Sequence, residues 1–171
     1  PYENNSIEGS NSVLDRDWKN YLKYIGEANK IIYNVDLVND NSFTTAERER
    51  YKAQAKIFRA LVYFDMVRLW GNLPIIDGLA DDITSENIVE VYPQYFPEQH
   101  SEQEVYAFIE KDLLESLASA PDNNPSDKTR LSKSVAHGLL AKPYAEKPFR
   151  DYNKVIQHAD MLATSVLDLN V

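Results

Sequence analysis

The chain has 171 residues, 43% of them hydrophobic and 11% aromatic, which suffices for one core and no more than two domains. A formal net charge of −9 argues against binding to phosphate backbones or anionic lipid surfaces. The absence of cysteine excludes disulfides, thiolate metal sites and cysteine nucleophiles. No apolar run approaches the roughly 20 residues that a membrane-spanning helix needs.

The first predicted helix follows a polar stretch, residues 1–11, whose Asn, Ser and Gly content is typical of a loop. Core packing is the favoured interpretation of Trp18, with a ligand platform as the alternative. Turn-forming residues at positions 36–42 end this unit. Helical spacing from about residue 13 places these apolar residues on one face: Trp18, Tyr21, Leu22, Ile25, Ala28, Ile31 and Ile32.

The second predicted helix is the longest and begins near Thr45, because Thr44 and Glu47 form a capping box. Its end is marked by Gly71, which can adopt the left-handed conformation, and by Pro74, which cannot continue a helix. A short extended piece is expected at residues 73–76. The buried stripe of this helix comprises Ala53, Ile57, Ala60, Leu61, Phe64 and Val67.

This segment carries a family resemblance. The run QAKIFRALVYFDMVRLWGNLPI, which starts at Gln54, resembles the E-A-x-F-L-R-A-x-x-Y-F-x-L-V-x-x-[YFW]-G-x-[VLI]-P signature of SusD/RagB outer-membrane nutrient-binding lipoproteins. Gln54 replaces the usual Glu, and Ile57 and Phe58 replace Phe-Leu. The first helix, with Trp18 and the pair Ala28-Asn29, also resembles the W-x-x-x-Y-x-x-I-x-x-A-N helix of that family, with its aromatic spacing one residue shorter.

Residues 77–100 are predicted to form a long irregular loop, and loops of this length are often functional. They include the proline-bounded aromatic run VYPQYFP, residues 91–97. Four acidic residues, Asp77, Asp81, Asp82 and Glu86, suggest a calcium site as one interpretation. Their spacing matches no known calcium loop, so a solvated acidic turn is favoured, and we predict no metal and no cofactor.

Three more helices are predicted in the C-terminal half. Ser101 and Glu104 form a second capping box, which opens a helix with Val105, Phe108, Ile109, Leu113 and Leu117 inward. The next helix opens at Ser132, and Pro143 should kink it or end it early. The last helix is expected from about residue 150 to 167, with its inward face made by Tyr152, Val155, Ile156, Ala159, Leu162 and Ala163.

The last two helices resemble a tetratricopeptide unit, since Leu140-Ala141-x-x-Tyr144 and Tyr152-x-x-Val155 occupy comparable positions. Tetratricopeptide-like helix pairs form the scaffold of SusD/RagB proteins, and residues 133–167 resemble their second conserved block. We therefore predict an all-α fold of about five main helices, built as a SusD-like scaffold of tetratricopeptide-like pairs with long irregular loops. Residues 1–171 would form a single helical domain, the N-terminal portion of a longer chain.

No catalytic constellation is present in the sequence. His100, His137 and His158 are scattered, and His137 and His158 are interpreted as helix-surface or partly buried residues rather than ligands. There is no G-x-S-x-G motif and no glycine-rich phosphate loop. Asp65 and Arg68, three residues apart, could form an ion pair on the long helix. The sequence therefore argues against an enzyme.

The resemblance implies a lipid-anchored protein on the outward face of the outer membrane, whose lipid anchor precedes this chain. Such a protein captures polysaccharide or oligosaccharide for a partner SusC-like, TonB-dependent transporter. Two alternatives remain open: an oligopeptide-binding member of the same family, or a tetratricopeptide-type adaptor that holds a protein segment.

Sugar recognition needs flat aromatic faces and planar polar groups on loops held by a rigid frame. The N-terminal loop and the 77–100 loop offer such groups, although local packing of these residues is an alternative. Arg59 is expected at the edge of the buried stripe, and Trp70 is expected to plug the helix end. The ligand-binding candidates are Tyr2, Asn4, Asn5, Tyr92, Tyr95 and Phe96, and the residues assigned to structure are Trp18, Arg59, Phe64, Trp70, Gly71 and Pro74.

Overall fold

A computed structural model describes residues 8, 10–124 and 126–167, without the side chains of residues 165–167. Within these residues the fold is all-α, as predicted, with five long helices, one short helix and two two-residue strands. None of the described helices is long and apolar enough to span a bilayer. The elements are α1 (Ser12–Asn34), α2 (Thr45–Trp70), β1 (Leu73–Pro74), α3 (Ile88–Val91), β2 (Gln99–His100), α4 (Glu102–Ser116), α5 (Lys133–Ala145) and α6 (Tyr152–Leu167).

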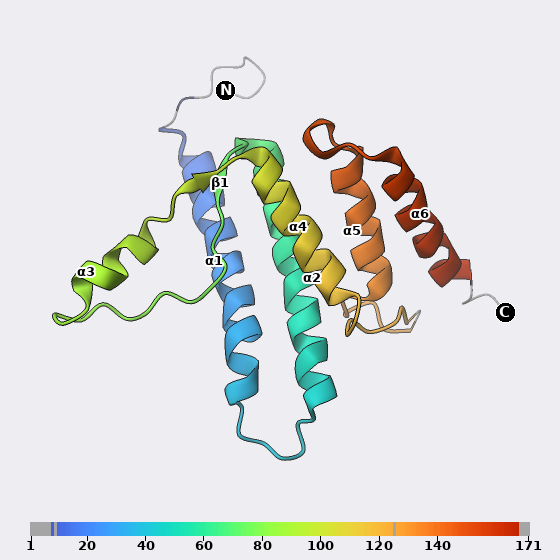
Figure 1. Cartoon of the computed structure of the whole chain (residues 1–171), viewed down its shortest axis with the longest axis horizontal. Coiled ribbons are helices and arrows are strands. Elements are labelled where there is room, and N and C mark those ends of the chain that lie inside the picture. Colours follow the sequence, from blue (N-terminus) through green and yellow to red (C-terminus); the bar gives the residue numbers. More distant parts are fainter. Residues whose placement is uncertain (1–7, 9, 125, 168–171) are drawn as a thin grey trace.

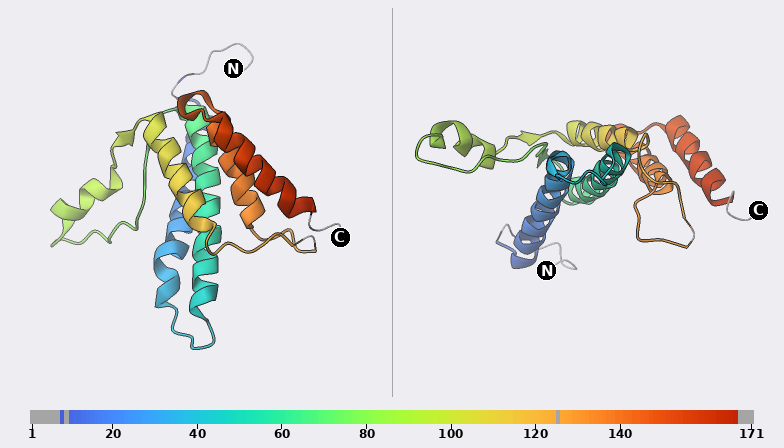
Figure 2. Two further views of the ribbon diagram at one scale, coloured as in Figure 1. Left: turned by 45° about the vertical axis from the view of Figure 1, so that its right-hand side comes forward. Right: turned by 90° about the horizontal axis from the view of Figure 1, so that it is seen from below.

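The long helices form a row in chain order, in which each packs against the next: α1 on α2, α2 on α4, α4 on α5, and α5 on α6 (Figure 1). Seen from below, this row is curved, and α3 projects beyond α1 and α4, away from α6 (Figure 2). The antiparallel α5–α6 pair is the tetratricopeptide-like unit expected from the sequence. Gly138 on α5 faces α6, where a Cβ would meet Leu162 at 3.5 Å, an ordinary van der Waals distance.

The predicted helix boundaries are confirmed where local chemistry sets them. Thr44 accepts a hydrogen bond from the Glu47 amide and Ser101 one from the Glu104 amide, and both capping boxes are complete. Gly71 closes α2 with a φ of +74°, the left-handed region that favours glycine. α5 ends two residues after Pro143, the early end that the sequence predicted.

α2 is buried on more sides than its predicted stripe requires. The stripe residues are buried or partly buried, but Val62, Tyr63 and Met66 are also inaccessible. The reason is that α1, α4 and α5 contact different sides of α2. α2 therefore lies at the centre of the core.

Three expectations about side chains are wrong. Tyr152 and Ile156 on α6 are exposed, at 61% and 60%, as are Ala159 and Ala163, because the α5 contact covers only one side of α6. Ile31 is likewise exposed on α1. Arg68 does not pair with Asp65. Its Nε lies 3.3 Å from Oε1 of Glu146, which is in the turn after α5.

Trp70 lies at the end of α2, where its ring meets those of Trp18 at 5.3 Å and Tyr21 at 5.8 Å, both edge-on. Because Trp70 is only partly buried, Trp70→Ala should lower the free energy of unfolding by about 2–3 kcal/mol, less than a fully buried Trp would lose. Urea unfolding measures this loss, with Tyr152→Ala as an exposed aromatic control expected within about 0.5 kcal/mol of the parent. Unchanged stability combined with lost ligand binding would instead assign Trp70 to a binding site.

Candidate functional site

The segment between the two short strands, residues 75–98, is called the excursion. β1 pairs antiparallel with β2, Leu73 opposite His100, so both ends of the excursion meet at the top of α2 and α4 (Figure 1). The excursion is less irregular than expected, since it contains α3 and a 3₁₀ turn, Tyr92–Tyr95. It projects from the helical row, and most of its residues are exposed, although Val91 is buried.

The base of the excursion is fixed by a buried arginine. Arg59 on α2 donates from Nε and Nη2 to the two carboxylate oxygens of Asp112 on α4, at 2.7 and 2.8 Å. Its Nη1 donates to Asn29 Oδ1 on α1 at 2.6 Å and to Asp77 Oδ1 at 2.8 Å. Arg59 is 2% exposed, so the expectation that its charge lies at the edge of the stripe is wrong. It lies at the centre because its acceptors come from three different elements.

Two further side chains bind the backbone at this base. Asn29 Nδ2 donates to the carbonyl oxygens of Ile76 and Gly78, at 2.9 and 2.8 Å. The Tyr63 hydroxyl accepts from the Ile76 amide at 2.8 Å and donates to the Pro74 carbonyl at 3.3 Å. The strand that leads into the excursion is therefore held by side chains of α1 and α2.

Burial and charge pairing act in opposite directions on the ionisable groups of this network. Burial alone would lower the pKa of Arg59, but Asp112 and Asp77 raise it above its ordinary value. Burial acts to raise the pKa of Asp77, yet the hydrogen bond from Tyr33 and the Arg59 charge hold it below its ordinary value. Burial raises the pKa of Tyr63 to about 12, so its hydroxyl stays protonated. Burial raises the pKa of Asp112, against the opposing hydrogen bond and charge of Arg59. We call this network of Arg59, Asp112, Asn29, Asp77 and Tyr63 the anchor of the excursion.

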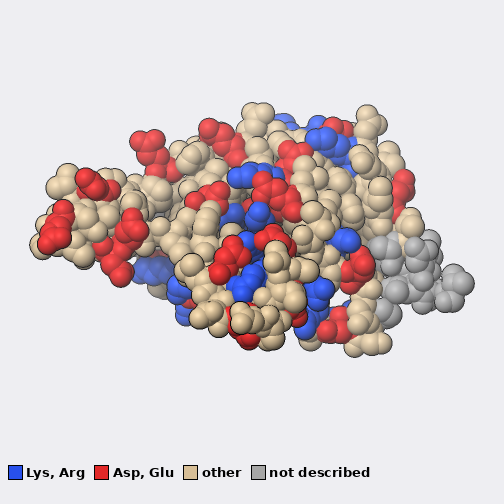
Figure 3. Space-filling model, turned by 60° about the horizontal axis from the view of Figure 1, so that its bottom comes forward, with Lys and Arg blue, Asp and Glu red and all other residues tan. Residues whose placement is uncertain are grey.

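One of the four acidic residues of the calcium interpretation, Asp77, is bound to other side chains in this arrangement. The Asp77 carboxylate binds Arg59 and Tyr33 and lies 3.6 Å from Lys111 Nζ, so it is not available to join Asp81, Asp82 and Glu86. No group of three or more His, Asp or Glu side chains that could hold a metal ion occurs in the part of the chain that the structure describes. Acidic side chains nevertheless gather on the excursion, which Figure 3 shows at its left.

The three aromatic candidates of the excursion are exposed. Tyr92 and Phe96 are 53% and 64% exposed, and their ring centres lie 4.8 Å apart. The hydroxyl of Tyr95 donates to the Asp81 carbonyl at 2.9 Å, which ties the two arms of the excursion together. The structure thus brings Tyr92 and Phe96 together as one aromatic surface and gives Tyr95 a bracing contact. Tyr2, Asn4 and Asn5 lie outside the described residues.

A cavity of about 350 Å³ lies at the foot of the excursion. It is lined by residues that include Ile75, Asp77, Leu79, Gln94 and Pro97, and none of the three aromatic candidates contributes to it. A ligand on the aromatic pair would therefore lie on an open surface rather than in this cavity.

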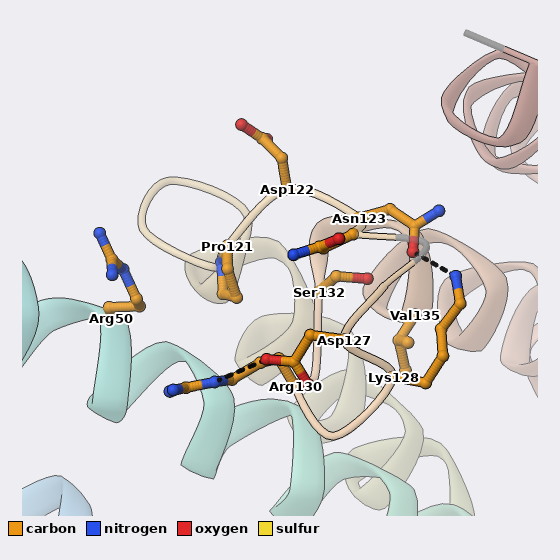
Figure 4. A pocket seen from close by; sticks show the side chains of 10 residues that line it. Arg50, Pro121, Asp122, Asn123, Asp127, Lys128, Arg130, Ser132 and Val135 are labelled. Atoms are coloured by element: carbon orange, nitrogen blue, oxygen red, sulfur yellow. Dashed lines mark hydrogen bonds and ion pairs between the residues drawn. The ribbon is translucent and has the colours of Figure 1, made fainter. Parts of the chain in front are cut away.

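A second candidate is a cavity of about 300 Å³ between α2 and the connection from α4 to α5 (Figure 4). Arg50 borders it from α2, and the connection supplies Asn123, Asp127, Lys128 and Arg130. Inside it, Arg130 Nε lies 3.5 Å from Asp127 Oδ2, and Lys128 donates to Asn123. Among the described residues no aromatic ring lines it, so a sugar would find hydrogen-bond partners there but no flat apolar face. The excursion is the stronger candidate.

The sequence itself contains a signal for the anchor. Asn29 and Asp112 fall on the apolar stripes of their helices, four residues after Ile25 and Phe108. A polar side chain at such a position is buried and must find a partner. Arg59, Tyr63 and Pro74 also belong to the family-like run. The structure brings them together with Asn29 and Asp112 at the base of the excursion.

Comparison with known proteins agrees with this architecture. The family model described as SusD-like, "Starch-binding associating with outer membrane", matches residues 2–145. "SusD-like protein P2" of Formosa agariphila is 29% identical over 159 residues, which cover 93% of this chain and 29% of that protein. A "SusD-like protein" of Bacteroides ovatus is 31% identical over 133 residues, 77% of this chain and 22% of that protein.

A solved structure described as a "Laminarin binding SusD-like protein" has the same fold, with a TM-score of 0.62 and 28% identity. The match covers 75% of this chain and 26% of that one. The chain thus spans less than a third of the length of these relatives. Its family-like run, its helical scaffold and the match of the family model over most of its length agree, and the chain belongs to the SusD-like family.

Proposed function

We propose that this chain is the N-terminal helical domain of a longer, lipid-anchored protein on the outward face of the outer membrane, which captures polysaccharide or oligosaccharide. A SusC-like, TonB-dependent transporter would take up the captured glycan. The observation that carries this proposal is the exposed Tyr92–Phe96 pair on an excursion whose base is hydrogen-bonded to the buried Arg59. Ring faces held on a rigid frame bind sugar rings with little loss of conformational entropy.

The relatives support a glycan as ligand and the outer membrane as location. One solved relative at 28% identity is described as laminarin binding, and the family model is described as starch-binding and outer-membrane associated. The chain would contribute part of the binding site, and the remaining part would come from the rest of the longer protein. Capture rather than cleavage fits two exposed aromatic rings, Tyr92 and Phe96, that lie side by side at a tilt.

The test is a glycan-array and peptide-library screen of the full-length protein, followed by affinity measurement on the best ligand. Tyr92→Ala/Phe96→Ala should weaken binding roughly five- to a hundredfold, because two stacked rings contribute about 1–3 kcal/mol. The matched control is Tyr152→Ala/Ile156→Ala, two exposed apolar side chains on α6, which should leave affinity unchanged.

Equal affinity of the Tyr92/Phe96 variant and the parent would move the site away from the excursion. Binding of peptides without glycans would favour the oligopeptide alternative. Incubation of the intact protein with the same glycans should yield no new reducing ends, and their appearance would reveal a hydrolase.

A further inference from the structure

Two histidines face each other across the α5–α6 contact. His137 on α5 and His158 on α6 place their Nδ1 atoms 2.9 Å apart, with ring centres at 5.2 Å. That separation is a hydrogen-bond length. The contact is therefore one hydrogen bond between two rings.

The number of protons decides whether this bond exists. A hydrogen bond between two Nδ1 atoms requires a hydrogen on one nitrogen and a free lone pair on the other. When both rings are fully protonated, both Nδ1 atoms carry hydrogens, so the bond is lost and two positive charges face each other. The bond therefore needs one hydrogen between the two Nδ1 atoms, and it is lost when both of these atoms carry one.

The groups around the pair strengthen this opposition. His158 is only 6% exposed, and its ring faces that of Tyr144 with centres 5.7 Å apart. Glu110, on α4, accepts hydrogen bonds from the Tyr144 hydroxyl and from Lys154 Nζ, so its charge is already paired. Asp151 lies at the start of α6, where its amide binds the Tyr144 carbonyl.

These surroundings shift both histidines in the same direction. Burial lowers the pKa of His137. Burial, His137 and Lys154 together lower the pKa of His158, against a weaker opposing effect of Glu110. Both rings thus resist protonation while α6 lies on α5.

We propose that His137 and His158 form a pH-sensitive latch, which holds α6 on α5 while the pair shares one proton and loosens when both rings become charged. A histidine freed from the contact takes up its proton near pH 6.5. Because the released state binds more protons, the latch is fully effective above that pH and weakens as the pH falls through it. The α5–α6 pair should therefore open first in acid.

Hydrogen exchange of the full-length protein, measured by mass spectrometry at pH 7.5 and 5.5 and corrected for intrinsic rates, tests the latch. Protection of α6 amides should fall about tenfold relative to α1 amides, the factor for one histidine that is released one pH unit below its ordinary value. In the His137→Gln variant residue 137 cannot take up a proton. The ratio of α6 to α1 protection should therefore differ by no more than about twofold between the two pH values. The control His100→Gln changes the third histidine, which lies on β2, and should behave like the parent.

A ratio that does not change with pH in the parent protein would overturn the latch, as would equal acid sensitivity in the His137→Gln variant. A second measurement needs no variant: exchange of the histidine ring Cε1 hydrogens gives the titration of each histidine. His137 and His158 should titrate in separate steps, at least one of them well below pH 6.5. A common midpoint near 6.5 would equally reject the proposal.

Discussion

Asp112→Ala should lower the free energy of unfolding by about 3–5 kcal/mol, because it leaves the guanidinium of Arg59 buried without its main counter-ion. Asp112 is 1% exposed and accepts two of the hydrogen bonds that Arg59 donates. Asp77, which lies nearer the surface, would remain as the one carboxylate paired with Arg59. Equilibrium urea unfolding measures the loss.

The matched control for Asp112 is Glu115→Ala, also on α4. Glu115 pairs with Lys56 at 2.7 Å but is 44% exposed, so its loss should cost about 0–1 kcal/mol. Replacing both members of the buried pair, as Arg59→Met/Asp112→Leu, should restore much of the stability, because no uncompensated charge is left. Similar losses for Asp112→Ala and Glu115→Ala would show that the buried pair does not stabilise this fold.

Asn29→Ala should lower the free energy of unfolding by about 2–4 kcal/mol, since two part-buried carbonyls and one buried guanidinium N–H lose their partner. Asn29 is the only side chain described here that binds both Arg59 and the backbone of the excursion base. We also expect faster hydrogen exchange at residues 76–80 and weaker glycan affinity, because the excursion is no longer held in place. Urea unfolding, hydrogen exchange and the glycan titration give these three readouts.

Asn20→Ala is the matched control for Asn29, with the same chemical change on an exposed turn of α1. It should leave stability within about 0.5 kcal/mol of the parent. The anchor would be rejected if Asn29→Ala destabilised the protein no more than Asn20→Ala. It would be reduced to a purely structural role if stability fell while exchange of the excursion and glycan affinity stayed the same.

The sequence by itself determined the elements whose ends depend on neighbouring residues. The capping boxes at Thr44 and Ser101, the glycine at position 71 and the proline at position 143 each act within one turn of the chain. Local periodicity likewise predicted five long helices and an all-α fold. The family-like run around Arg59 identified the SusD-like family without any tertiary information.

The candidate site could be predicted only in part. The aromatic residues of the excursion were identified from the proline-bounded run at 91–97, and whether they bind a glycan stays a prediction. That Tyr92 and Phe96 pair while Tyr95 binds the Asp81 carbonyl could not be predicted, since it depends on how the loop turns back. The pairing of β1 with β2 was missed for the same reason: two residues in each strand leave no periodic pattern.

Only the tertiary structure decided which faces of the helices are covered. It buried Arg59 with partners 18, 30 and 53 positions away, and it joined His137 to His158 across 21 positions. It also left Tyr152 and Ile156 of α6 exposed, although their spacing is that of a buried stripe. Periodicity reports which residues share a face of a helix, but burial and pairing depend on the neighbour that packs there, and that neighbour is distant in the sequence.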